Sequence, residues 1–348
     1  MKKALLAVLI PSLLGASSAF AGGIDLIKND DITLNFNGDI DLKSYTVIKD
    51  GDSAGTDTEV IFDDIDFDIT YNVNEDLKLI SGIDLTADGK TTDAGLTKGE
   101  SGETNDLESV AVDLIWVGFA SDTYGKAIWG NIETSWDSLG IDNSELDGGV
   151  ASGWLDGAGT THTNAIRYDY TIGDLVIGGT YGIPGDERAS NKLTQLTLKY
   201  TPGDLLIYTG IGQTTTYSSN SAESDKSIYA SLEIEYDFGD YTAAVLLTQE
   251  EQDIVSGTDI SSTGFEVDFT YQLTSKVKLA AGADFITQDI DGKDDFTYAY
   301  AAAVYKFNKL ASIRYELARA DGDVVRFVDS EQNKDNEIKT GILVNLQF

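Results

Sequence analysis

The chain has 348 residues, of which 59 are acidic and 24 are basic, and its formal net charge is −35 at pH 7. A polyanion would be repelled by this charge, so nucleic acid is excluded as a partner. The chain has no cysteine, which excludes disulfides, thiolate metal sites and cysteine catalysis. We expect no cofactor and no resident metal.

The first predicted element is an export signal. Two lysines precede an apolar run over residues 4–14, and Ala19-Phe20-Ala21 supplies the small-x-small pattern that precedes a cleavage site. The apolar run is shorter than the ~20 residues that a membrane-spanning helix needs. We therefore expect residues 1–21 to be a cleaved signal peptide and residues 22–348 to form one domain.

After the leader, almost every segment alternates apolar and polar residues with a period of two, as half-buried strands do. The last segment is the clearest, because Ile338, Ile342 and Phe348 share one face while Lys339 and Asn345 share the other. The pattern predicts sixteen strands: 32–48, 57–73, 77–88, 107–121, 125–134, 164–171, 174–182, 192–201, 204–214, 227–238, 240–250, 262–273, 276–288, 295–306, 309–320 and 337–348.

The connections between these strands alternate in length. Every second one is a tight turn, such as Asn74-Glu75-Asp76 or Pro202-Gly203. The others are longer and polar: 49–56, 89–106, 135–163, 183–191, 215–226, 251–261, 289–294 and 321–336. This sorting is typical of an outer-membrane barrel with its turns in the periplasm, whereas a soluble sandwich would not show it. The sequence therefore predicts an all-β, 16-stranded antiparallel transmembrane β-barrel.

Aromatic residues near the strand ends agree with that architecture. Rings with one apolar and one wet edge suit the two membrane interfaces. The residues concerned are Tyr168, Tyr170, Tyr200, Tyr236, Phe238, Tyr241, Tyr271, Tyr298 and Tyr300. We expect these rings on the outer surface, and the inward positions are correspondingly poor in aromatic residues.

In a closed barrel in lipid, the outward face is apolar and the lumen can be polar. The alternation turns carboxylates inward on several strands, notably Asp39, Asp64, Asp66, Asp68 and Asp113, together with Asp41, Glu233, Glu235, Asp237, Glu266 and Asp268. Lys43, Arg167, Lys199 and Arg314 also fall inward, so the predicted pore lining is acid-rich rather than purely acidic. Like charges enclosed by low-dielectric walls concentrate counter-ions, which predicts a preference for cations.

The run Asp64-Ile65-Asp66-Phe67-Asp68 superficially suggests a calcium loop. It lacks the turn glycine and the distal glutamate of such a loop, and apolar residues fill its alternate positions. A strand is the better interpretation.

The longest connection, 135–163, shows no clear strand of its own. It is rich in acids, namely Asp137, Asp142, Glu145, Asp147 and Asp156. A loop of this length in a compact protein is usually functional or disordered. The alternative is a surface loop that binds lipopolysaccharide through divalent cations.

The motifs around this loop resemble those of a known family. A strand with Val117-Gly118-Phe119, a tight turn and a second strand ending in Gly130-Asn131 lead into the loop. The segments 145–149 and 166–170 and the terminal Phe348 follow in order. This arrangement resembles the general-diffusion porins of Gram-negative bacteria over essentially the whole chain after the leader.

The resemblance implies a homotrimer in the outer membrane, in contact with lipid and lipopolysaccharide, through which small hydrophilic solutes and cations diffuse. It implies that the long third loop folds into the lumen, where the five loop acids form the constriction, and that Phe348 is part of the assembly signal. Relatives carry basic residues opposite that loop, whereas Asn131 follows Gly130 here. The basic positions fall on Asp39, Asp64, Asp113 and Asp169, which strengthens the expected cation preference and allows divalent cations between loop and wall.

Three other functions stay open. An enzyme in the barrel wall needs a serine, a histidine and an orienting partner, but the only histidine, His162, lies in or beside the long loop. We therefore expect no enzyme. A substrate-specific channel would need a run of aromatic residues along the lumen. A structural or adhesive barrel would have a plugged lumen.

Overall fold

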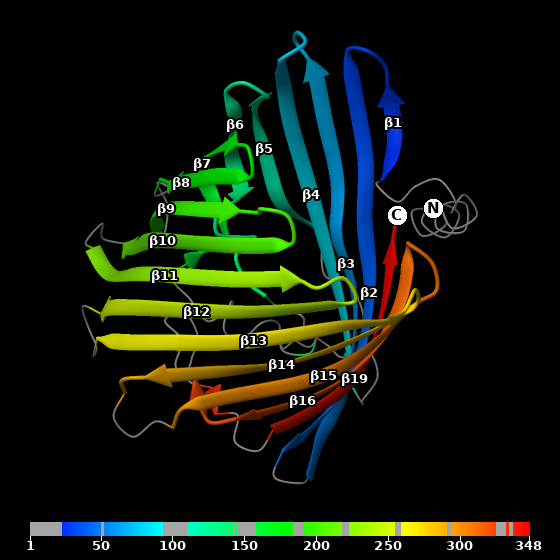
Figure 1. Ribbon diagram of the computed structural model, residues 1–348, viewed down its shortest axis with the longest axis vertical. Helices are drawn as coiled ribbons and strands as arrows, with labels where there is room; N and C mark the ends of the chain where they lie inside the picture. The colour runs from blue at the N-terminus through cyan, green and yellow to red at the C-terminus, as the bar shows by residue number, and fades with distance from the viewer. Residues whose placement is uncertain are drawn as a thin grey trace.

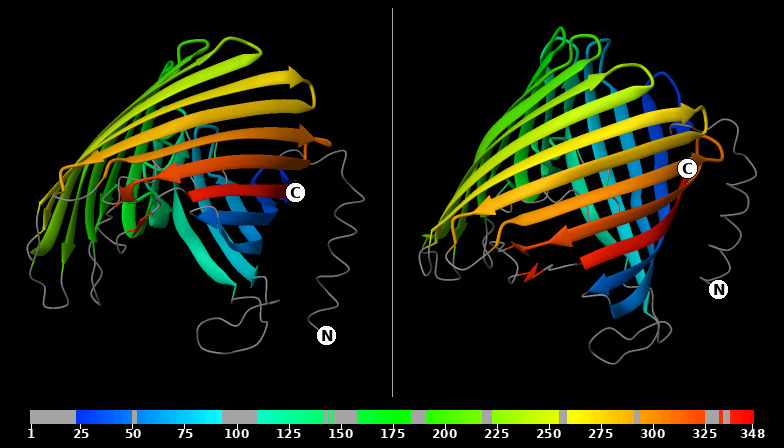
Figure 2. Two further views of the ribbon diagram at one scale, coloured as in Figure 1. Left: turned by 90° about the horizontal axis from the view of Figure 1, so that it is seen from below. Right: turned by 60° about the horizontal axis from the view of Figure 1, so that its bottom comes forward.

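The computed structural model describes residues 23–49, 52–92, 110–141, 144, 146, 158–183, 191–217, 223–254, 259–290, 294–324, 332–333 and 337–348. Within these ranges the protein is all-β, and sixteen long strands form a closed antiparallel barrel (Figures 1 and 2). No helix in the described residues is long and apolar enough to cross a membrane. The expected leader, residues 1–21, lies outside the described residues.

Each barrel strand pairs with the next one in the chain, and the last pairs with the first to close the ring. The strands are β2 (Ile32–Lys49), β3 (Asp52–Asn72), β4 (Leu77–Thr92), β5 (Ala111–Ser121), β6 (Gly125–Glu133), β7 (Thr161–Ile172), β8 (Leu175–Gly182), β9 (Asn191–Tyr200), β10 (Leu205–Tyr217), β11 (Glu223–Asp237), β12 (Tyr241–Ile254), β13 (Ile260–Thr274), β14 (Val277–Gln288), β15 (Phe296–Lys306), β16 (Ala311–Asp321) and β19 (Glu337–Gln347). Two-residue strands β17 (Asp323–Val324) and β18 (Gln332–Asn333) pair within the last long connection.

All sixteen predicted strands are present, although several of their bounds differ by a few residues. A short strand that the sequence did not reveal, β1 (Ile24–Lys28), pairs with the start of β2, while β19 pairs with the remainder of it. Main-chain hydrogen bonds in both directions join Phe348 to Gly38 between these two pairings. The connection predicted over 49–56 is also shorter, because Lys49 already faces Asp52 in the ladder.

Burial alternates along the strands as the two-sided pattern requires. In β13, Phe265 and Phe269 are exposed on the outside, whereas Glu266 and Asp268 are buried on the inside. The exposed positions of the other strands are largely apolar, which is the surface that a lipid bilayer covers. The polar groups of the sheet therefore gather on its inner face.

Most of the predicted interface aromatics lie on the outer surface near the turn end of the barrel. Tyr236 packs on Phe238, and Tyr241 stacks on Tyr271 with their ring centroids 4.5 Å apart. The prediction was wrong for Tyr298 and Tyr300, which are buried on the inner face at 2% and 6% exposure. Their strand alternates aromatic residues with alanine. Because both kinds are apolar, hydrophobicity alone did not distinguish the two faces.

Candidate functional site

The inner face of β3 to β7 brings together residues that the sequence predicted in separate strands. Asp66 and Asp68 from β3 and Arg167 from β7 line one cavity of about 170 Å³. Asp84, Lys126 and Glu133 line the same cavity, although no sequence pattern pointed to them. The Lys126 ammonium lies 5.3 Å from the centre of the Trp116 ring. This part of the lumen therefore carries charges of both signs.

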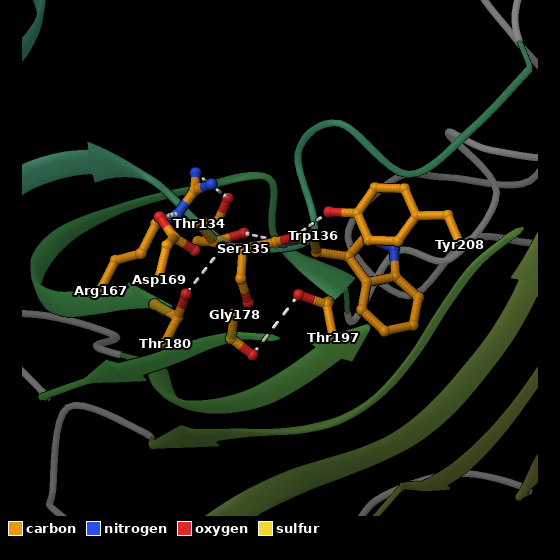
Figure 3. A network of polar contacts seen from close by, with 9 residues as sticks. All are labelled: Thr134, Ser135, Trp136, Arg167, Asp169, Gly178, Thr180, Thr197 and Tyr208. Atoms are coloured by element: carbon orange, nitrogen blue, oxygen red, sulfur yellow. Dashed lines mark hydrogen bonds and ion pairs between the residues drawn. The ribbon is translucent and has the colours of Figure 1, made fainter. Parts of the chain in front are cut away.

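Arg167 and Asp169 form an ion pair on β7 (Figure 3). The Arg167 Nε lies 2.8 Å from Asp169 Oδ2, and its Nη1 donates to the Thr134 carbonyl oxygen at 2.8 Å. Thr134 is the first residue after β6. The pair therefore fixes the point at which the long connection leaves the barrel wall.

Three other predicted pore-lining residues have different surroundings. The Asn345 amide donates to Asp39 at 2.9 Å and to Asp41 at 2.8 Å, across the seam between β19 and β2. Asp113 is exposed at a break in the β4–β5 register, where Leu114 rather than Asp113 faces Asp84. Because the β4–β5 ladder skips Asp113, strict alternation does not decide on which face its side chain lies, and its place in the pore lining stays a prediction. The side chain of Asp64 lies outside the described residues.

Residues 134–141, 144 and 146, which belong to the connection between β6 and β7, are called the inner segment below. Its start is bound to inward-facing residues of β8 and β10 (Figure 3). The Ser135 N–H donates to Thr180 Oγ1, and the Tyr208 hydroxyl donates to the Ser135 carbonyl, both at 2.7 Å. The inner segment thus begins along the inside of the barrel.

Trp136 is the main packing contact of the inner segment. Its side chain is only 2% exposed, and its ring meets the edge of Tyr229 with the centroids 4.9 Å apart. A Cβ atom added at Gly210 would lie 2.6 Å from the Trp136 ring. Because such a distance is a clash, glycine at position 210 provides the space for the indole.

The far end of the inner segment is bound to carboxylates. The Gly140 N–H donates to Glu233 Oε2 on β11 at 2.9 Å, and the Ser144 hydroxyl donates to Glu316 Oε1 on β16 at 2.6 Å. The Leu146 N–H also reaches Glu316, at 3.3 Å. The contacts of the inner segment therefore run along the inner face from β8 to β16.

Of the predicted constriction acids, the structure describes only Asp137, which is exposed. The others, Asp142, Glu145, Asp147 and Asp156, lie outside the described residues.

The inner face of β11 to β16 carries a set of carboxylates that we call the acidic wall. Its members are Glu233, Glu250, Glu266, Asp268, Asp284 and Glu316, each between 1% and 5% exposed. Arg314 pairs with Glu316 at 2.6 Å. Glu250, Asp284 and Glu316 were missed in the sequence, although strict alternation through β12, β14 and β16 would have found them. In the described ranges, no group of three histidine, cysteine or acidic residues is arranged to hold a metal ion.

Comparison with known families decides the identity of this barrel. The model of a family described as Gram-negative porin matches residues 4–324. The chain belongs to the Gram-negative porins. This porin is therefore an outer-membrane protein that forms a channel.

Solved structures show the same fold at low sequence identity. OmpT, an outer membrane protein of Vibrio cholerae, matches with a TM-score of 0.73 and 21% identity over 93% of this chain and 100% of that chain. An anion-selective porin from Comamonas acidovorans gives 0.68 and 16% over 91% and 99%. Salmonella typhi OmpF, solved with daunomycin, gives 0.66 and 14% over 92% and 99%. A comparison with curated proteins gave no match. At these identities the structural likeness shows the fold alone.

Proposed function

We propose that this porin lets small hydrophilic solutes diffuse through its lumen and that it prefers cations. The observation that carries the proposal is the acidic wall, in which six carboxylates lie on the inner face of β11 to β16 and Arg314 forms an ion pair with one of them, Glu316. Charges inside low-dielectric walls act more strongly than on an open surface, because the field is focused into the lumen. Cations are concentrated there and anions are repelled.

The inner segment supports this proposal by bringing solutes close to the carboxylates. Its contacts with Glu233 and Glu316 place main chain over part of the inner face. A narrower lumen keeps a passing ion within the Debye length of the wall, which is ~8 Å at physiological ionic strength. In this proposal the inner segment forms the constriction that the sequence assigned to the third loop.

The test is a reversal potential across a planar bilayer that separates two concentrations of potassium chloride. We expect a potential whose sign shows potassium to be more permeant than chloride. The triple variant Glu233→Gln, Glu266→Gln, Asp284→Asn should move the potential towards zero. A preference of the wild type for chloride would overturn the proposal.

A matched control removes the same number of charges outside the lumen. Asp174, Asp204 and Asp240 lie in or beside tight turns and are exposed. Their replacement by asparagine should leave the reversal potential almost unchanged. An equal shift in the two triple variants would mean that overall charge, rather than the acidic wall, sets the selectivity.

A substrate-specific channel is the second candidate, because the inner face proves richer in aromatic residues than the sequence suggested. These residues are Trp136, Tyr208, Tyr229, Phe296, Tyr298 and Tyr300. All are buried, and several bind the inner segment or the wall: Tyr298 contacts Ser144, and Tyr300 donates to Asp268. They are therefore poorly placed to stack on a passing sugar. Liposome swelling that saturates with one solute would favour this second function.

We also propose that the protein is a homotrimer without enzymatic activity. One of the similar structures is described as the trimer form of OmpT. In this chain the ring nitrogens of His162 contact main-chain groups of Asn191 and Asn164, which does not resemble a histidine held beside a serine nucleophile. Cross-linking in mild detergent should give a threefold mass, and lipid micelles and peptides should not be hydrolysed.

Lipopolysaccharide is the proposed lipid partner of the outer surface, as the sequence resemblance implies. Co-purification of lipopolysaccharide with protein extracted from outer membranes would support it.

A further inference from the structure

The tight turns of the barrel differ in charge. Five of them carry carboxylates, at Asp76, Asp122, Asp174, Asp204 and Asp240. The two remaining turns, β13–β14 and β15–β16, contain Lys276 and Lys309 and no acid. These two turns are neighbours, because β14 pairs with β15 (Figure 1). In a chain with a net charge of −35, this local basic character is unexpected.

A cavity of about 510 Å³ lies between these two turns and the end of β19, and we call it the turn pocket. Lys276, Lys306 and Lys309 line it, together with the polar residues Asn308, Ser312 and Gln347. No carboxylate is among the described residues that line it. The turn pocket is thus concave and carries three cationic side chains beside several polar ones, which suits a small anion.

Main-chain contacts hold the turns that carry these lysines. The Lys306 N–H donates to the Lys276 carbonyl at 2.8 Å, which joins one turn to the other. Asn308 Oδ1 accepts from the Leu310 N–H at 2.7 Å, so the amide nitrogen of Asn308 is left for another partner. The arrangement of the lysines therefore follows from the backbone and does not depend on a protein counter-charge.

The three ammonium groups form no ion pair within the part of the chain that the structure describes. Lys276 lies 5.9 Å from the centre of the Tyr305 ring, an interaction that leaves its donors available. Asn345, which lines the turn pocket, donates its amide to Asp39 and Asp41 across the seam between β19 and β2. Three like charges in one concavity repel each other, and a bound anion relieves that repulsion.

We propose that the turn pocket binds a phosphate group. A tetrahedral oxyanion can accept hydrogen bonds from several directions at once, and lysine is a common phosphate ligand because its ammonium is a compact charge with three donors. The Asn308 and Gln347 amides and the Ser312 hydroxyl supply further donors. The phosphate can belong to a soluble phosphorylated solute or to a phospholipid headgroup of the periplasmic leaflet, since turns of such barrels face the periplasm. This site is independent of the cation preference proposed above.

The first arm of the test measures the binding of inorganic phosphate to the protein in a detergent that contains no phosphate. Binding is detected as a broadening of the phosphorus NMR line of the phosphate. We expect broadening with the wild type and at least about tenfold weaker binding in the triple variant Lys276→Gln, Lys306→Gln, Lys309→Gln. The control variant Lys49→Gln, Lys192→Gln, Lys226→Gln removes the same charge near the opposite end of the barrel. It should bind phosphate like the wild type.

The second arm measures urea unfolding in vesicles of phosphatidylcholine with and without phosphatidylglycerol. Stabilisation by phosphatidylglycerol that is absent in the turn-pocket variant and retained in the control would identify a lipid headgroup as the source. Phosphate binding without this lipid effect would identify a soluble phosphorylated solute rather than an anionic phospholipid as the source. Equal responses of the two triple variants in both arms, or no response of the wild type in either, would overturn the proposal.

Discussion

The two halves of the inner face hold the inner segment in different ways. Beyond the Arg167 contact at Thr134, neutral groups of β8, β10 and β11 bind its start, through Thr180, the Tyr208 hydroxyl and the packing of Trp136 on Tyr229. Further along, the carboxylates of the acidic wall bind its main chain and Ser144. A segment fixed by packing at one end and by charge at the other should lose each attachment separately. It also means that the acidic wall has a structural role besides its proposed effect on selectivity.

Removal of the packing attachment should have the largest effect. Trp136→Ala empties a buried site and should lower the free energy of unfolding by about 3–5 kcal/mol. Urea unfolding in vesicles measures this loss, and single-channel recording should show a larger, noisier current because the start of the inner segment is released. Trp129, whose ring is exposed on the outer face, is the control. A conductance change in Trp129→Ala equal to that in Trp136→Ala would show that the packing is not responsible.

Removal of the charged attachment should have a smaller effect on stability. Glu316→Gln keeps the side-chain shape but removes the charge that holds Ser144 and Arg314, and hydrogen bonds to charged groups contribute about 1.5–3 kcal/mol. We expect increased current noise together with weaker cation preference. Glu250→Gln is the matched control, because the Glu250 carboxylate accepts a hydrogen bond from Ser227 in the wall. Glu250→Gln should weaken the cation preference without increasing the current noise.

Removal of a single hydroxyl from the neutral groups that bind the start of the inner segment should have the smallest effect on stability. Tyr208→Phe removes only the hydrogen bond to the Ser135 carbonyl, which predicts a loss of about 0.5–1.5 kcal/mol in unfolding experiments. Since no charge changes, the reversal potential should stay as in the wild type. A shift in that potential would mean that the two halves of the inner face are coupled, contrary to the comparison above.

Most of the fold could be predicted because it depends on local patterns. Alternation and turn length gave all sixteen long strands and their antiparallel order. Alternation did not predict the inward face of β15, because apolar residues occupy both faces of that strand. It also did not place Asp113, because the register between β4 and β5 breaks there. The short strand β1 was missed because five residues give little periodicity.

The site was less predictable because its contacts join distant parts of the chain. The Arg167–Asp169 pair lies within one strand, and spacing places both side chains on the same face. By contrast, Ser144 and Glu316 are 172 residues apart, and no local pattern indicates which strand the long connection reaches. The turn pocket was missed for the same reason, since Lys276 and Lys309 belong to separate hairpins.

A substitution outside both halves of the inner face tests whether the effects above are specific to the lumen. Asp76 joins two neighbouring turns by accepting hydrogen bonds from Ser121 and Thr123. These bonds hold the pKa of Asp76 below its ordinary value of 3.8, and the bond from the Ser121 hydroxyl is the largest cause. A carboxyl with a lowered pKa stabilises the fold at pH values above its ordinary pKa, and this contribution is lost as the pH falls through the lowered value. Asp76→Asn should therefore be slightly less stable than the wild type at pH 7, and the difference should shrink in acid. Conductance and reversal potential should not change, and a change in either would show that the turns act on the inner segment.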